Sequence, residues 1–358
     1  MPDDTVLVIG GGPAGLYAAR GVADLGAPVM LVEKRDRLGG TPQAAHYASL
    51  TPHLEDAETA INRMIDDVSN DPLIEVLLQT RVTACQGEAG HFQVTLTSKG
   101  GEQRNVAIGS IIVATGFDHF DPGRETQMYG YYEYEDVLTL VDAEKMLKEK
   151  NFVRPSTGLP PKRVCFIQCV GSRDRRLGNT YCSKVCCGIA SKEAIEIKEQ
   201  LPDTKVFIFY IDMRMYGFWE DQIYWKAQEE HKVNYIKGII TEVVRRGDSL
   251  VIKGEDTTMG RPMEIPMDVV ILSVGMVPSV GTLEIAKVLN LPRESHGFLE
   301  TVGGPLDTVS TPVAGIFVAG AAAGPKDLED SISMAGAAAM KAVSTVRRLR
   351  KSAAATTS

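Results

Sequence analysis

The chain has 358 residues, of which 44% are hydrophobic and 23% are charged, a composition that predicts a globular protein long enough for two domains. Its formal net charge of −8 and pI of about 5.4 argue against a nucleic-acid partner. No apolar run reaches the roughly 18 residues that a transmembrane helix needs. Because the chain opens directly into a strand pattern rather than a signal peptide, we expect a cytoplasmic protein whose thiols stay reduced.

A strand, a glycine-rich turn, a helix and a second strand follow one another in residues 5–34. In a G-x-G-x-x-G unit the first glycine makes a tight turn and the second lets the backbone approach a pyrophosphate. The third glycine lets the helix pack on the strand, and an acid after the second strand binds an adenosine ribose. We therefore predict a dinucleotide site rather than a turn without a ligand. Its expected contacts are Gly10, Gly12, Pro13, Ala14, Gly15, Glu33 and Lys34.

The first domain continues to the end of a strand at residue 116. A pair of glycines after the ribose acid predicts a loop that passes close to the second phosphate. Residues 53–70 predict an amphipathic helix, and residues 73–113 predict several strands separated by glycine-rich or polar turns. The last strand ends in Ala-Thr-Gly, whose glycine again permits close approach of a cofactor. The expected contacts of this section are Gly39, Gly40, Val82, Ala114, Thr115 and Gly116.

Five of the six cysteines lie in one segment, residues 163–200. Its pattern predicts a buried strand over 163–168, a polar and basic loop over 173–180, and a helix over 182–200. Cys165, in the middle of this strand, is expected in the core. Cys85, in the earlier strand RVTACQ, is expected in the core or on an edge strand.

The remaining cysteines, Cys169, Cys182, Cys186 and Cys187, predict a metal or redox site, because a reducing compartment disfavours a disulfide framework. Three of them are expected in the first turns of the helix, where free N–H groups favour an anion. A dianionic cluster of four iron and four sulfide ions suits this setting; tetrahedral zinc and core or unoccupied thiols are the alternatives. Cys182 and Cys186 would share a helix face, whereas Cys187 would need an irregular helix start to reach the same centre.

The region around the cysteines predicts a second β-α-β domain. We expect helices over 135–150 and 214–237, a hairpin at RRGDS, and a strand over 267–275 that returns the chain to the first domain. The strand after Pro161 does not end in a second G-x-G-x-x-G. The phosphate cradle of a nicotinamide domain is therefore expected to be replaced by the thiols.

The C-terminal segment contains a strand that ends at Gly320 and Ala321. In flavoproteins with two dinucleotide-binding domains this strand ends in Gly-Asp, and the acid meets the ribityl chain, so Ala321 is a departure from that pattern. A helix opens after Lys326, and we expect its N–H groups around Ser331 and Ile332 to stabilise negative charge on a reduced flavin. The alternative is an Ala-rich packing helix. The small, polar residues 351–358 predict a disordered tail.

Three motifs together resemble the A subunit of heterodisulfide reductase. They are VIGGGPAGLYAA, the stretch from QCVGSRD to YCSKVCCGIASKEA, and GIFVAGAAAGPKDLEDSI. The resemblance covers almost the whole chain and implies FAD beside one [4Fe-4S] cluster. It further implies that Lys192 approaches the flavin N5, where the alternative is a solvated helix lysine. The cluster ligands that it implies are Cys169, Cys182, Cys186 and Cys187.

The chain also departs from this family. Methanogen members carry additional iron–sulfur sites, whereas Cys85 is the one cysteine of this sequence outside the central segment. One flavin and one cluster are therefore expected, without the wiring for electron bifurcation. The short form resembles the A subunit of the heterodisulfide-reductase-like complex of sulfur oxidisers. That likeness implies B- and C-type subunits as partners and a lipoate-binding protein as the sulfur carrier. A homodimer is expected as well, and whether NAD is a further electron partner stays open.

The predicted fold is α/β, with two Rossmann-like domains of the glutathione- and thioredoxin-reductase flavoprotein type and a β-meander insertion. Residues 1–120 and 266–350 would form the FAD domain, 121–265 the degenerate nicotinamide-type domain with the cluster, and 351–358 the tail. The predicted function is that of an oxidoreductase subunit that transfers electrons. The alternative is a stand-alone NAD(P)H:acceptor reductase, against which the missing second glycine motif and the absence of Cys-x-x-Cys argue. A third possibility is an inert assembly scaffold that keeps its flavin for stability.

Overall fold

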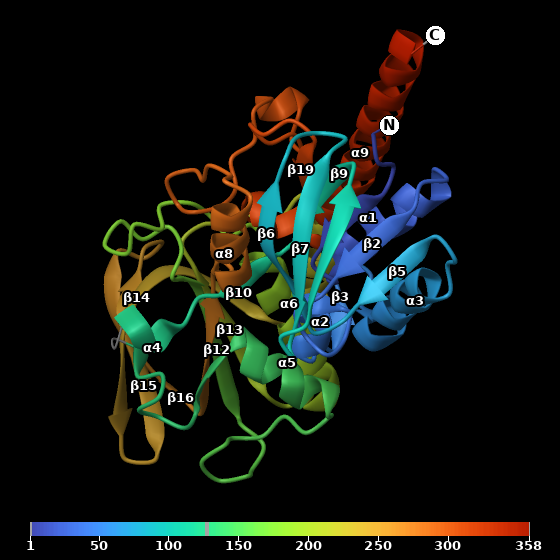
Figure 1. The fold of residues 1–358 in the computed structure, drawn as a ribbon. Coiled ribbons are helices and arrows are strands. Elements are labelled where there is room, and N and C mark those ends of the chain that lie inside the picture. The colour runs from blue at the N-terminus through green and yellow to red at the C-terminus, as the bar shows by residue number, and fades with distance from the viewer. Residues whose placement is uncertain (1, 126–128, 358) are drawn as a thin grey trace. The chain divides into compact units, whose positions relative to one another are not determined.

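The computed structural model describes residues 2–125 and 129–357, which form two compact units (Figure 1). Unit 1 combines Met1–Ala44, Thr59–Asp118 and Val277–Ser358, and unit 2 combines Ala45–Glu58 with His119–Met276. Residues 45–58, which the sequence assigned to the first domain, belong to unit 2, so the chain enters this unit after Ala44 and leaves it after Glu58. The other two crossings lie in the short strands β10 (Phe117–His119) and β18 (Met276–Pro278). These crossings lie beside the predicted boundary at 120 and eleven residues beyond the one at 265.

Unit 1 is built on a parallel sheet of order β19-β9-β1-β2-β5. Every residue of the four strands other than β5 is buried, as expected for short apolar strands covered on both faces. The strands are β1 (Val6–Ile9), β2 (Val29–Val32), β5 (Ile74–Leu77), β9 (Ser110–Val113) and β19 (Ile316–Val318).

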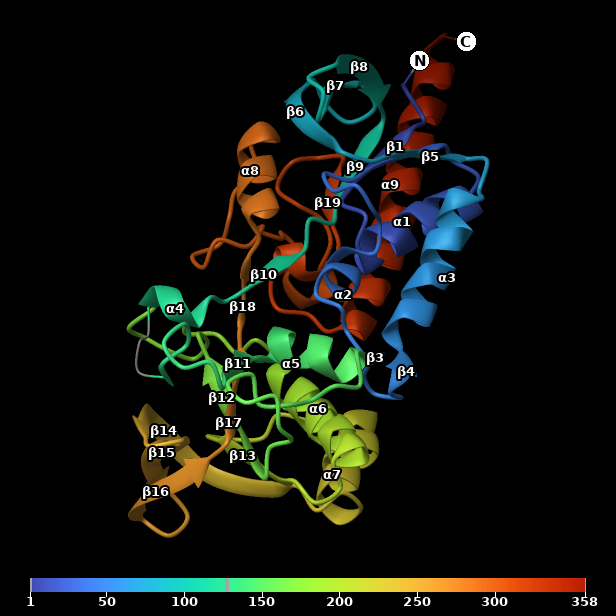
Figure 2. The same ribbon diagram turned by 90° about the horizontal axis from the view of Figure 1, so that it is seen from below.

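Different layers cover the two faces of this sheet (Figure 2). One face packs on the helices α1 (Pro13–Asp24), α3 (Ala57–Ser69) and α9 (Leu328–Thr357). The other packs on α8 (Val280–Val288) and on an antiparallel meander, which confirms the predicted β-meander. The meander strands are β6 (Thr80–Gln86), β7 (Phe92–Ser98) and β8 (Gln103–Ile108).

Small residues set the distance between α1 and α9. The buried side chains of α9 that join the core are mainly alanines, from Ala335 to Ala342. A Cβ added to Gly21 of α1 would lie 3.2 Å from the Cβ of Ala339. The Ala-rich composition of α9 therefore serves helix packing, as one interpretation of its sequence held.

Unit 2 is built on a seven-stranded sheet of order β11-β17-β12-β13-β14-β15-β16. The strands from β11 to β14 pair in parallel, and β15 and β16 extend the sheet as antiparallel neighbours. The strands are β11 (Val137–Thr139), β12 (Arg163–Val170), β13 (Lys205–Tyr210), β14 (Asn234–Arg246), β15 (Ser249–Asp256), β16 (Arg261–Met267) and β17 (Val269–Val274).

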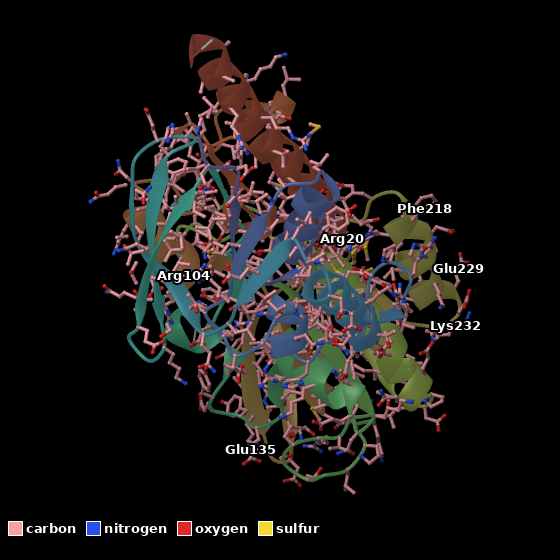
Figure 3. The ribbon with its side chains drawn as sticks, turned by 45° about the vertical axis from the view of Figure 1, so that its right-hand side comes forward. Arg20, Arg104, Glu135, Phe218, Glu229 and Lys232 are labelled. Atoms are coloured by element: carbon pink, nitrogen blue, oxygen red, sulfur yellow. The ribbon has the colours of Figure 1, made fainter. Side chains whose placement is uncertain are left out.

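Helices α5 (Leu140–Lys148) and α6 (Cys186–Gln200) pack on one face of the parallel strands around Phe166 and Ile271. A π-helical turn (Glu220–Trp225) and α7 (Lys226–Glu229) follow β13. Near them Phe218 is 71% exposed, and Figure 3 shows it on the same side as Glu229 and Lys232. The remaining elements are α2 (Gly40–Ala44), β3 (Ser49–Leu50), β4 (Glu55–Asp56), α4 (Pro122–Glu125) and the 3-10 turns Gly304–Leu306 and Gly320–Ala323.

Two predicted helices begin later than their patterns indicated. The helix predicted over 53–70 begins at Ala57, because Glu55–Asp56 pair with β3 instead. The helix predicted over 135–150 begins at Leu140, because the residues before it form β11. Thr139 is the last residue of that strand, and its side chain caps α5 in a capping box with Asp142.

Two further predictions for unit 2 are wrong in part. Of the helix predicted over 214–237, Glu220–Glu229 is helical, and the chain enters β14 at Asn234. The strand predicted over 267–275 is β17, which lies between β11 and β12 in the sheet of unit 2. It therefore completes this sheet before the chain returns to unit 1. The predicted hairpin at RRGDS is confirmed by the pairing of Arg246 with Ser249.

The C-terminal residues extend α9 to Thr357, so the predicted disorder of 351–357 is wrong; residue 358 lies outside the described residues. Three consecutive alanines, Ala353 to Ala355, favour the helix here. In Figure 1 this end of α9 extends past the sheet of unit 1. No helix among residues 2–125 and 129–357 is long and apolar enough to cross a membrane.

Candidate functional site: a glycine cradle and a thiol cluster

The glycines of the turn between β1 and α1 serve two different roles. A Cβ added to Gly10 would lie 2.4 Å from the carbonyl oxygen of Ala114, and one added to Gly15 would lie 1.7 Å from that of Gly10. These two glycines are therefore required by the fold itself. A Cβ added to Gly12 would meet, among the described residues, only the Cα of Gly40 within 4 Å, at 3.5 Å. The protein thus leaves space at Gly12, where a dinucleotide pyrophosphate binds in such turns.

The start of α1 and the next loop border this space. Helix α1 begins at Pro13 after Gly12, and no side chain caps it, so N–H groups of its first turn point toward the space without intrahelical partners. Gly39 donates its N–H to the carbonyl of Gly11 at 2.8 Å. Gly40 has a φ of +62°, and a Cβ there would lie 2.6 Å from the Cα of Gly12. The structure therefore places the Gly39–Gly40 loop against the cradle.

The Glu33 carboxylate is held in a fixed orientation at the end of β2. Its Oε2 accepts the N–H of Gly11 at 2.7 Å, and its Oε1 accepts the N–H of Arg35 at 2.8 Å. Each oxygen keeps lone-pair capacity for a further donor, such as a ribose hydroxyl. The next residue, Lys34, places its Nζ 3.2 Å from where a Cβ on Gly281 would lie.

The strand end at Ala114 meets the N-terminus of α8. Thr115 Oγ1 and Thr282 Oγ1 are 2.7 Å apart, and the Ser279 hydroxyl donates to the carbonyl of Thr115 at 3.0 Å. Ser279 also caps α8 by accepting the N–H of Thr282. Our sequence analysis missed Ser279 and Thr282, although Ser279 followed by a helical pattern is a recognisable N-cap signal.

Two other predicted contacts lie nearby. A Cβ on Gly116 would meet no described atom within 4 Å, and Gly116 has a φ of +69°. The Val82 side chain is buried in the core beneath the meander. Val82 can therefore meet a cofactor through its backbone alone, whereas Gly116 leaves space beside the strand end.

The C-terminal contacts lie near Ala14 at the start of α1. A Cβ on Gly320 would lie 2.8 Å from that of Ala14, and Ala321 is buried in the 3-10 turn that follows. Ser331 donates its N–H to the carbonyl of Asp327 at 3.1 Å, and Ile332 follows inside α9. Helix α9 thus begins at Leu328, three residues before Ser331. The role of Ser331 and Ile332 toward a reduced flavin stays a prediction.

In unit 2, the four predicted cluster ligands lie at the end of β12 and around the start of α6. Cys169 has a φ of +64°, where the register of β12 shifts. Cys186 and Cys187 open α6 and are buried. Cys182 lies before the helix, because Lys184 has a φ of +66° that a helix does not accept. The predicted shared helix face of Cys182 and Cys186 is therefore wrong.

The thiols nevertheless occupy one neighbourhood. Hydrogen bonding to Cys186 lowers the pKa of Cys169 to about 7, helped by the charge of Arg173. Cys186 also donates a hydrogen bond to the Cys187 thiol, and this hydrogen bond lowers the pKa of Cys187. Because Cys186 is the donor to both neighbouring thiols, its own pKa is raised. Arg214 interacts with the Cys187 thiol through its backbone and with the Cys182 thiol through its charge.

The other two cysteines are separate from this group. Cys165 is fully buried in β12, and burial raises its pKa; Cys85 is half-buried in β6. Within the described ranges, no three Cys, His, Asp or Glu side chains converge on a single metal ion.

Lys192 lies inside unit 2 and is 1% exposed, so it is not a solvated helix lysine. Its ammonium pairs with Glu144 of α5, donates to the carbonyl of Ser49 at 3.2 Å, and lies 3.6 Å from Glu196 Oε2. Burial opposes its charge, but the neighbouring carboxylates outweigh burial and raise the Lys192 pKa. Our sequence analysis missed these carboxylates, although the spacing of Lys192 and Glu196 is typical of a helix ion pair.

Known proteins share this sequence and this fold. Residues 4–342 match the pyridine nucleotide-disulphide oxidoreductase family. The A subunit of the H(2):CoB-CoM heterodisulfide,ferredoxin reductase of Methanothermobacter marburgensis is 30% identical over 95% of this chain and 63% of its own length. The A subunit of the ferredoxin:CoB-CoM heterodisulfide reductase of Methanosarcina acetivorans is 32% identical over 94% of this chain and 56% of its own length. The chain thus spans less than two thirds of these relatives.

Solved structures confirm the predicted fold class. Thioredoxin reductase of Lactococcus lactis superposes with a TM-score of 0.64 at 19% identity, covering 97% of this chain and 100% of that one. The T. acidophilum enzyme gives 0.62 at 18% identity, covering 96% and 98%. The fold is therefore the thioredoxin-reductase-like arrangement of two Rossmann domains. Together with the family match, it makes this chain an oxidoreductase that belongs to the pyridine nucleotide-disulphide oxidoreductase family and is related to the A subunits of heterodisulfide reductase.

Proposed function

We propose that this chain is the FAD- and [4Fe-4S]-containing electron-transfer subunit of a heterodisulfide-reductase-like complex in cytoplasmic sulfur oxidation. Its partners would be B- and C-type subunits, a lipoate-binding protein would carry the sulfur substrate, and the protein would form a homodimer. The observation that carries the proposal is the pairing, in one chain, of an open glycine cradle with three mutually interacting thiols, Cys169, Cys186 and Cys187. Cys182 is linked to them through Arg214, which interacts with both Cys182 and Cys187. The similarity to the A subunits of heterodisulfide reductase supports it.

The residues of unit 1 fit FAD. Gly12, the Gly39–Gly40 loop and the start of α1 would hold the pyrophosphate, because they border the space that no described atom fills. Glu33 would accept the ribose hydroxyls. Thr115 and Thr282 offer hydroxyls at the strand end, where cofactors bind in open α/β sheets.

The thiols of unit 2 fit an iron–sulfur cluster. Cys169, Cys182, Cys186 and Cys187 would be its ligands, and Arg173 and Arg214 would offset negative charge beside them. When bound, the flavin supplies two-electron chemistry and the cluster supplies one-electron transfer. The sequence after β12 contains no second G-x-G-x-x-G, which favours partner subunits over NAD as electron source.

Lys192 is proposed to act on the flavin through its charge. One unit charge a few ångström away is worth roughly 2–4 kcal/mol at an effective dielectric constant near 20. Lys192→Met should therefore lower the two-electron potential of the bound flavin, whereas Lys198→Met on the same helix should leave it unchanged. A potential that is equal in all three proteins would show that Lys192 has a structural role only.

The proposal is tested by purifying the protein without oxygen and measuring its visible spectrum, flavin, iron and acid-labile sulfide. One FAD and about four iron and four sulfide ions per chain are expected. Zinc in place of iron would remove the electron-transfer role. Rapid reduction of the flavin by NADH in the isolated chain would favour a stand-alone reductase, and resistance to every electron donor would favour a scaffold.

A further inference from the structure

Unit 2 buries more negative than positive charge around Lys192. Glu144 is 3% exposed and Glu193 is fully buried, while the Glu196 carboxylate is 13% exposed. The side chains whose charges act most strongly on Glu193 are Glu144, Lys192 and Glu196, and Lys192 is the one ammonium among these three. Three ionised carboxylates against one ammonium would leave two uncompensated charges in the interior. Because burial of unpaired charge is so unfavourable, at least one carboxylate must hold a proton.

The hydrogen bonds show which carboxyl holds it. Glu144 accepts the N–H of Ala48 at 2.9 Å and pairs with Lys192, and Glu196 accepts the Ser49 hydroxyl at 2.5 Å. In contrast, no N–H or O–H among the described residues donates to either oxygen of Glu193, and the side-chain group it approaches for a hydrogen bond is another carboxylate, Glu144. A carboxylate without donors is the form that burial disfavours most. In agreement, burial and the charge of Glu144 raise the pKa of Glu193.

A route for protons leads outward from this cluster within unit 2. Tyr47 directly precedes Ala48, whose N–H donates to Glu144 at 2.9 Å. Burial raises the pKa of the Tyr47 phenol, and the charges of Glu144 and Glu193 add to this effect. Tyr47 Oη lies 3.2 Å from Nε2 of His119, whose side chain is half-buried. A phenol both donates and accepts a proton, and imidazole is the side chain best suited to exchange one with water near neutral pH.

We propose that unit 2 contains a proton-transfer site, in which Glu193 holds a buried proton and Tyr47 and His119 connect it with solvent. When Glu193 releases its proton, the proton leaves through the Tyr47 hydroxyl to His119, and the return path restores it. Glu144 and Glu196 stay ionised beside Lys192 throughout. The net charge of the cluster then changes from −1 to −2 and back.

The use of this proton rests on the proposed function, because two-electron reduction of a flavin takes up at least one proton. The existence of the site does not. A protein without FAD or a cluster would still hold a neutral Glu193, so the two proposals fail separately.

Infrared spectroscopy of the purified protein tests the site. At pH 7 the wild type should show the C=O stretch of a protonated carboxylic acid, and Glu193→Gln should abolish it. Glu199→Gln, an exposed position on the same helix, is the matched control and should leave the band unchanged. No such band in the wild type, or a band that persists in Glu193→Gln, would overturn the proposal.

Deuterium exchange tests the route. On transfer to D2O the band of Glu193 should shift quickly in the wild type and at least about tenfold more slowly in Tyr47→Phe, which keeps the ring but lacks the hydroxyl. Tyr235→Phe is the control and should exchange like the wild type. It removes another part-buried tyrosine hydroxyl, which donates a hydrogen bond to Ser191 of α6. Equal rates in wild type and Tyr47→Phe would exclude Tyr47 from the route.

Discussion

The absence of a side chain serves the cofactor site at Gly12 and the fold itself at Gly15. Gly12→Ala should cost no more than about 1 kcal/mol of unfolding free energy, because its Cβ meets only ordinary contacts. It should nevertheless reduce bound FAD, since the methyl group enters the space of the pyrophosphate. Flavin per chain and urea unfolding of the flavin-free protein measure the two effects.

Gly15→Ala is the matched comparison. Its Cβ would overlap the carbonyl oxygen of Gly10, so it should destabilise the protein whether or not flavin is present. Full flavin content in Gly12→Ala would contradict the assignment of the cradle.

Glu193 makes stability depend on pH in a defined direction. Its pKa is raised in the folded state, so its contribution to stability is present below the unfolded pKa of about 4.3 and is lost as pH rises toward the folded value. The loss reaches at most about 1.4 kcal/mol per pH unit. The Glu193→Gln variant lacks this titrating group. Its free energy of unfolding minus that of the wild type should therefore increase between pH 5 and pH 8. Urea unfolding at both pH values measures this, and a constant difference would show that Glu193 is ionised.

At the level of elements, the β12–α6 connection should act as one ligand set. Serine at Cys169, Cys182, Cys186 or Cys187 should lower iron and sulfide content and bleach the broad absorption beside the flavin bands. FAD should remain, because its cradle lies in unit 1. Serine at Cys165 is the control and should cost stability without affecting iron, since this thiol lies in the core. Loss of iron in Cys165→Ser together with a full cluster in Cys187→Ser would contradict the ligand set.

Sequence patterns predicted elements better than they predicted element starts. The strand β12 and the meander follow from apolar periodicity, and the glycine turn follows from its spacing. The start of α6 did not, because the backbone of Lys184 is left-handed, with a φ of +66°, and the helical pattern of the sequence does not indicate this break. The same holds for the cluster around Lys192. Its members come from the 45–58 segment, α5 and α6, and no local pattern indicates that Glu144 and Lys192 meet.

For the whole molecule, α9 is expected to be indispensable although it lies at the end of the chain. It covers the apolar face of α1, including Leu16 and Val22, in the core of unit 1. A chain that stops at Asp327 should therefore expose that face, lose FAD and aggregate. Gel filtration and flavin content measure this, with a chain that stops at Arg350 as control. A monodisperse yellow protein that lacks α9 would contradict the role assigned to the helix.

The interrupted order of the units has a consequence for biosynthesis. All segments of unit 2 have been translated once Met276 is made, whereas unit 1 still lacks the edge strand β19 and α9. Because domains fold as units while the chain grows, the thiol-bearing unit can form on the ribosome while the nucleotide-binding unit waits for the last eighty or so residues. Under the proposed function, assembly factors would then meet the cysteines before any flavin can be retained, so the nascent chain would acquire the proposed cluster before FAD.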